Sequence, residues 1–247
     1  MVEGGTLSQA DFGKELGKEV ILFCHFTTRI KGRNNERLLR EVGGTSFPSF
    51  FIFDAQGRVL GKHQGQRSID GFLGTIRKAH EVIQLQNRIA AGDKAASIQL
   101  LRLKLEMGAI LFADAKRLRA KIEDTSETLS IIDGLLAGLA YQDRLSKLRK
   151  KMIPRQLDPK LRREAIAKYQ QAVCALTIEC IENGQIPKGG RNEISFWRNA
   201  MFAANSAGDP DLLEKAIQKS DTGNSRMKPY LDGMRKRVQE LRKKQKK

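Results

Sequence analysis

The chain has few cysteines, few aromatic residues and no long apolar run. Its 247 residues include three cysteines, and 6% of them are aromatic. No apolar stretch approaches the ~20 residues that a membrane-spanning helix needs, so no membrane span is expected. Residues 1–5 show no basic segment leading into an apolar one, as a secretory signal would. We therefore expect a soluble, cytoplasmic protein, although a precursor trimmed of its signal would look the same.

The three cysteines, Cys24, Cys174 and Cys180, are odd in number and lie in apolar surroundings. This favours free, buried thiols in a reducing compartment over a disulfide framework. Cys24 is expected to be a core residue, and the other two, six residues apart on one helix, are not expected to pair. No metal-ligand spacing joins the cysteines with the three histidines, so neither a metal site nor another cofactor is expected.

The N-terminal third contains a succession of short elements. Residues 20–26 form an apolar run that predicts a buried strand. A second strand is expected at 46–53, entered through Pro48, and 58–62 is expected to return beside it as a hairpin. Helices are predicted at 8–17, at 34–42, and from Ile69 to about Leu85 behind the N-cap Ser68.

This order of elements, with a Gly-Gly-x-x-Phe-Pro segment at residues 43–48, resembles the thioredoxin-like superfamily. It is similar in particular to bacterial proteins in which a cysteine-free thioredoxin-type domain precedes a helical region. The resemblance implies a cis peptide between Phe47 and Pro48, in a loop with Gly44 that faces the redox turn. Where the family carries its Cys-x-x-Cys pair, this chain has Arg29, Ile30, Lys31 and Gly32. Disulfide exchange without an attacking thiolate and a resolving thiol has no mechanism, so no catalytic residue is assigned.

Only 21 residues separate Phe26 from Pro48, which leaves room for one short helix. We therefore expect a pared-down sheet of about three strands in this part of the chain.

After residue 80 the pattern is helical, with turn signals between the helices. Asp158-Pro159 and Asp209-Pro210 each place an N-cap carboxylate before a proline at the first helical position. The segments 194–204 and 212–217 predict an antiparallel helix hairpin that looks like tetratricopeptide packing without a strict repeat period. A further helix carries one apolar side, formed by Leu161, Ala165, Tyr169, Val173, Leu176 and Cys180.

The expected fold class is thus α+β. A thioredoxin-like domain that lacks the CxxC motif is expected at residues 1–80, and an all-α, repeat-like domain with a basic tail at residues 81–247.

The net charge of +17 is concentrated in two stretches. Residues 144–168 and residues 226–247 each hold ten basic and two acidic residues. Such blocks suit a polyanion such as RNA, the ribosome or an anionic membrane surface, or else form a solvated helix face and a frayed tail. The candidate basic surface comprises Arg144, Lys147, Arg149, Lys150, Lys151, Arg235, Lys236 and Arg237.

The function that these features favour is a non-catalytic interaction protein. It would bind a protein partner through its helical domain and the loop around Pro48. Two alternatives remain open: an RNA- or ribosome-associated basic protein, and a residual thiol-disulfide oxidoreductase that uses Cys24 or a C-terminal cysteine.

Overall fold

The computed structural model describes residues 5–25, 37–44, 47–122, 127–154 and 158–245. The chain divides into two compact units, residues 1–122 and residues 123–247. Within the described ranges, every helix is too short or too polar to cross a lipid bilayer.

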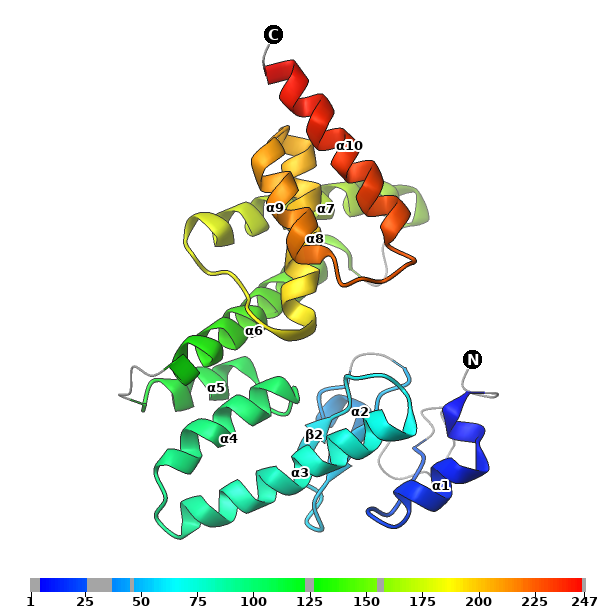
Figure 1. The fold of residues 1–247 in the computed structure, drawn as a ribbon, viewed down its shortest axis with the longest axis vertical. Helices are drawn as coiled ribbons and strands as arrows, with labels where there is room; N and C mark the ends of the chain where they lie inside the picture. The colour runs from blue at the N-terminus through cyan, green and yellow to red at the C-terminus, as the bar shows by residue number, and fades with distance from the viewer. Residues whose placement is uncertain (1–4, 26–36, 45–46, 123–126, 155–157, 246–247) are drawn as a thin grey trace. The chain divides into compact units, whose positions relative to one another are not determined.

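The first unit is built around the long helix α3, Ile69–Ala90 (Figure 1). Ser68 caps it as predicted, because its side-chain oxygen accepts a hydrogen bond from the backbone N–H of Gly71. One end of α3 packs Phe72 and Ile76 against Leu16, and the rest packs against β2 and α4. The other elements of the unit are η1 (Thr6–Ser8), α1 (Ala10–Leu16), α2 (Leu38–Glu41), β1 (Phe51–Phe53), β2 (Val59–Lys62), α4 (Ala95–Glu106) and α5 (Phe112–Arg119).

The predicted hairpin is present. β1 and β2 pair antiparallel, with Phe51 opposite Lys62 and Ile52 opposite Gly61. The turn is fixed by Asp54, whose carboxylate accepts bonds from the backbone N–H groups of Gln56 and Arg58. This Asx-type turn joins the two strands of the hairpin that the sequence predicted.

The prediction of a thioredoxin-like sheet is wrong. The described residues contain ten α-helices and a sheet of only two strands, β1 and β2, so the structure is mostly helical rather than α+β. Residues 21–25 form no strand, and the side chains of Ile21 and Phe23 are 95% and 65% exposed. Cys24 is exposed as well, not a core residue. An apolar run identifies a strand only when a neighbouring strand completes its ladder, and no described strand pairs with this segment.

The boundary expected at residue 80 falls inside the continuous helix α3. This helix packs on β2 with one part of its surface and on α4 with another. Strand-containing and helical segments therefore share one unit, which extends to residue 122.

The second unit is all-helical. It consists of α6 (Glu127–Met152), α7 (Pro159–Glu182), α8 (Gly190–Ala207), α9 (Pro210–Ser220) and α10 (Lys228–Gln245). The predicted hairpin of two helices is formed by α8 and α9, and α7 runs across them in the view of Figure 1. Gly208, with φ of 72°, ends α8, and the Asp209 carboxylate accepts from the N–H groups of Asp211 and Leu212 to start α9.

The core of this unit centres on three aromatic rings. Phe196 stacks edge-on against both Tyr141 and Trp197, and small residues such as Ala216 pack around them. A buried polar node joins three helices at the Tyr141 hydroxyl, which bonds to Thr177 Oγ1 at 2.8 Å and accepts from Asn199 Nδ2 at 2.8 Å. The node fixes where α6 crosses α7 and α8.

Candidate partner-binding surface

The residues expected at the redox turn, Arg29, Ile30, Lys31 and Gly32, lie outside the described residues. The loop expected to face them is described in part. The Phe47–Pro48 peptide bond is cis, which agrees with the conformation expected for this bond. Gly44 closes α2, because its N–H donates to the Leu39 carbonyl at 2.6 Å. Phe47 is 66% exposed, so its ring fills no buried space.

The three cysteines differ in exposure. All three are free: Cys24 is exposed, Cys174 is half-buried and Cys180 is buried. Burial raises the pKa of the Cys174 thiol and that of the Cys180 thiol, which lowers the thiolate fraction that a nucleophile needs. The described residues include no group of three His, Cys, Asp or Glu side chains that could hold a metal ion.

The arginines of the second basic stretch are engaged by carboxylates. Arg235 pairs with Asp221 at 2.9 Å and with Asp232 at 2.6 Å. Arg237 pairs with Glu240 at 2.9 Å and also donates to the side-chain oxygen of an asparagine on α8. Lys236 is exposed on the same helix. Carboxylates therefore offset the charge of these two arginines, whereas Lys236 has no ion pair within the described residues.

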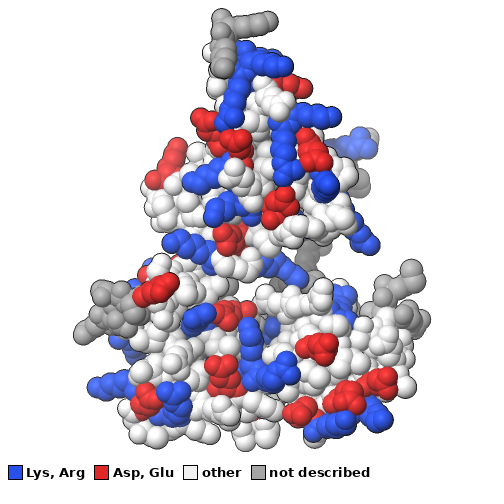
Figure 2. Space-filling view, viewed as in Figure 1, with Lys and Arg blue, Asp and Glu red and all other residues white. Residues whose placement is uncertain are grey.

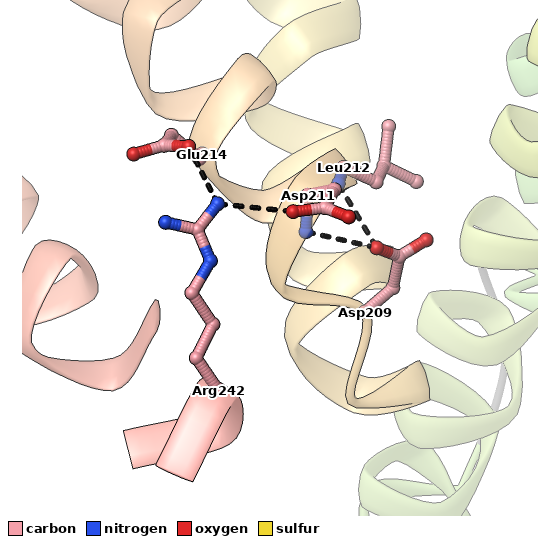
Figure 3. Close-up of polar contacts among 5 residues, drawn as sticks. All are labelled: Asp209, Asp211, Leu212, Glu214 and Arg242. Carbon is pink, nitrogen blue, oxygen red and sulfur yellow. Dashed lines mark hydrogen bonds and ion pairs between the residues drawn. The ribbon is translucent and has the colours of Figure 1, made fainter. Parts of the chain in front are cut away.

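Arg242 makes the clearest of these contacts. It reaches from the last turn of α10 to α9, where its guanidinium donates to Asp211 at 2.9 Å and to Glu214 at 2.8 Å (Figure 3). These hydrogen bonds raise the pKa of Arg242 above its ordinary value. Asp209, which caps α9, lies beside them. Figure 2 shows the result on one face, where basic and acidic side chains alternate over α9 and α10.

The first basic stretch differs. Arg144 is held by both carboxylate oxygens of Glu179 at 2.7 Å, and Lys147 pairs with Asp143 at 2.6 Å. The last turn of α6 carries Arg149, Lys150 and Lys151, all exposed and without an ion pair to any residue that the structure describes. Cations at a helix C-terminus interact favourably with the helix dipole, which accounts for their tolerance there but leaves them available to a partner.

The surface continues on α7 with residues that lie in the predicted basic stretch 144–168 but were not named as members of the candidate basic surface. Arg162 and Arg163 are exposed in the first turns of α7 and have no ion pair within the described ranges. Leu161 and Ile166 are 55% and 38% exposed beside them. The sequence already contained the signal, because Leu161 belongs to the predicted apolar side of this helix. What it could not show is that this side is uncovered over the first half of α7.

The two basic stretches are not gathered on one pair of adjacent helices. α10 packs mainly on α9, whereas α6 packs on α7 and α8. The candidate surface therefore consists of the end of α6 and the start of α7, and the expected members Arg235, Lys236 and Arg237 belong to a different helix, in which the two arginines pair with carboxylates.

Comparison with protein-family models, with curated proteins and with solved structures finds no match to this chain.

Proposed function

We propose that the protein is a non-catalytic interaction protein whose helical unit, residues 123–247, binds a protein partner. The observation that supports this is the uncovered start of α7, where exposed aliphatic side chains lie among arginines that no described carboxylate neutralises. Exposed apolar side chains rimmed by charge are typical of protein-binding surfaces. The node at Tyr141 joins the second half of α7 to α6 and α8, and the start of α7 continues from this packed part as one helix.

Nucleic-acid binding is the second candidate, favoured by the cations at the end of α6. It requires phosphate contacts, whose number sets a steep dependence of affinity on salt. The engagement of Arg235, Arg237 and Arg242 by carboxylates reduces the cations that α10 could offer. The only exposed tyrosine of the helical unit, Tyr230, packs against Phe202 at 6.4 Å between ring centroids, which gives little support for base stacking within the described residues.

A capture experiment separates the two. The tagged full chain is incubated with native lysate, with and without nuclease, and the retained material is identified by mass spectrometry. A protein partner should be retained after nuclease treatment. Loss of all retained protein with nuclease would refute protein binding in favour of nucleic-acid binding. An insulin-reduction assay with the same preparation should show no dithiol-dependent turnover.

A further inference from the structure

One side of α7 is core at its second half and exposed at its first half. Val173, Leu176 and Cys180 are buried on this side. With about 100° of rotation per residue, Tyr169 and Ala165 continue this side toward the helix start, and Leu161 and Ile166 lie at its two edges, about 140° apart around the helix. Of these, Leu161 and Ile166 are exposed, and Ala165 and Tyr169 are only half-buried. The apolar side of α7 therefore extends beyond the helices that cover it.

Five cations flank this uncovered segment along the chain. Arg162 and Arg163 lie on it, and Arg149, Lys150 and Lys151 form the last turn of α6. Six residues join α6 to α7, so the two ends lie within about 25 Å of each other. Lys168, two turns further along α7, differs from these arginines because it pairs with Glu164.

We propose that residues 161–172 of α7, with the end of α6, dock an amphipathic helix of a partner protein that carries acidic residues beside its apolar face. The proposal rests on the proposed function and adds the chemistry of the partner. A segment of this length spans about 17 Å, or three turns, which suits the docking of one helix along another. Leucine-type side chains of the partner would cover Leu161 and Ile166, and its carboxylates would meet the arginines.

Two other proteins could occupy this surface, the chain's own first unit and a second copy of the chain, and charge argues against both. Residues 1–122 hold 20 Lys and Arg against 12 Asp and Glu, so the first unit is itself positive. A second copy of the chain, at +17, would repel. An acidic segment from another protein meets no such repulsion.

The apolar side also distinguishes the partner from other polyanions. RNA phosphates could pair with the arginines but would leave Leu161 and Ile166 in water. An anionic membrane would require a continuous apolar face to insert, whereas Arg162 lies in the middle of this one.

The test uses the full chain and a fluorescein-labelled synthetic helix of about 18 residues, with leucine on one side and glutamate beside it. Anisotropy titrations at low salt should show saturable binding. The double substitution Leu161→Ser with Ile166→Ser should weaken it about tenfold or more, because the partner's apolar side then has nothing to cover. Leu111→Ser, at a leucine 70% exposed in the first unit, is the matched control and should leave affinity unchanged.

Charge is tested in the same way. Arg162→Gln with Arg163→Gln should weaken peptide binding and flatten its salt dependence, whereas Lys243→Gln with Lys244→Gln, two exposed lysines of α10, should have a smaller effect. Circular dichroism should show unchanged helix content in every variant, since all the substituted side chains are exposed.

Several results would overturn the proposal. The first is that the peptide does not bind at low salt, and the second is that the control variants lose as much affinity as the test variants. The third is that Leu161→Ser with Ile166→Ser weakens binding to oligouridylate, or to vesicles of equal parts phosphatidylcholine and phosphatidylserine. If the protein captured from lysate is retained by the Leu161→Ser, Ile166→Ser variant, the docking surface is wrong while protein binding stands. If no protein is captured by the unsubstituted chain, protein binding itself fails.

Discussion

Replacing Tyr141 with phenylalanine should destabilise the helical unit, because it removes the hydroxyl where α6, α7 and α8 meet. The ring stays and keeps its edge-on contact with Phe196. Two hydrogen bonds are lost, one with Thr177 at 2.8 Å and one with Asn199 at 2.8 Å. Thr177 keeps its bond to the Val173 carbonyl at 2.7 Å, so the larger penalty falls on the Asn199 amide, which loses its acceptor.

The expected loss is about 1–3 kcal/mol in the free energy of unfolding, the range for a buried donor left without its partner. The assay is urea unfolding followed by the fluorescence of Trp197. This is the only tryptophan in the chain, it is 2% exposed, and it belongs to the second unit, so it reports that unit alone. Tyr230→Phe is the control, because Tyr230 is exposed, and it should change stability by less than about 0.5 kcal/mol.

A double-mutant cycle shows whether the node acts as a unit. Thr177→Val keeps the shape of the side chain, and its effect combined with Tyr141→Phe should be smaller than the sum of the two single effects. If Tyr141→Phe and Tyr230→Phe lower the free energy of unfolding equally, and its slope against urea concentration is unchanged, the role given to the node is refuted.

Three further predictions concern separate sites. Cys24, being exposed, should react rapidly with a maleimide, whereas the buried Cys180 should react only on unfolding; equal rates, followed by mass spectrometry, would contradict the burial described. Burial lowers the pKa of His63 below its ordinary value. The first unit should therefore lose stability as pH falls below about 6.5, because the unfolded state takes up the proton first. An NMR titration of the imidazole ring with a higher midpoint in the folded chain than in urea would contradict this. Gly134→Ala should lower the stability of the helical unit, because the new Cβ would meet the Lys188 side chain. Gly233→Ala lies at an exposed helix position with open space and should raise stability by about 0.5–1 kcal/mol. Thermal unfolding of both variants tests the two expectations.

Local sequence signals predicted the elements whose cause is itself local. Ser68 and the Asp209-Pro210 pair mark the starts of α3 and α9, because the side chains of Ser68 and Asp209 each bond to backbone N–H groups within a few residues. Such contacts depend on neighbours in the sequence, so the sequence suffices to locate them.

The failures have a different cause. The run at 20–26 reads as a buried strand only if a distant strand pairs with it, and the described structure provides none. The division of the chain at 122 depends on α3 packing with both β2 and α4, which no local composition shows. A count of positive charge placed Arg235 and Arg237 in a binding surface, which stays a prediction; the structure adds that carboxylates pair with both arginines.

The candidate surface was half visible in the sequence. The basic end of α6 stands out as a charge run, and the apolar side of α7 stands out as a periodicity. The exposure of the first half of this side, beside arginines that pair with no described carboxylate, reflects the crossing of α6 and α7 near Tyr141, far from the start of α7.

The most direct test of the account is photo-crosslinking from the surface itself. A photoreactive phenylalanine analogue is placed at Leu161 in the full chain, and at Lys236 of α10 in a control, and the adducts formed in cells are identified by mass spectrometry. We expect the Leu161 position to yield adducts with an acidic, helix-forming segment of another protein and the Lys236 position to yield few. Adducts with nucleic acid or lipid at Leu161, or equal protein adducts at both positions, would contradict the claim that α7 is the docking surface.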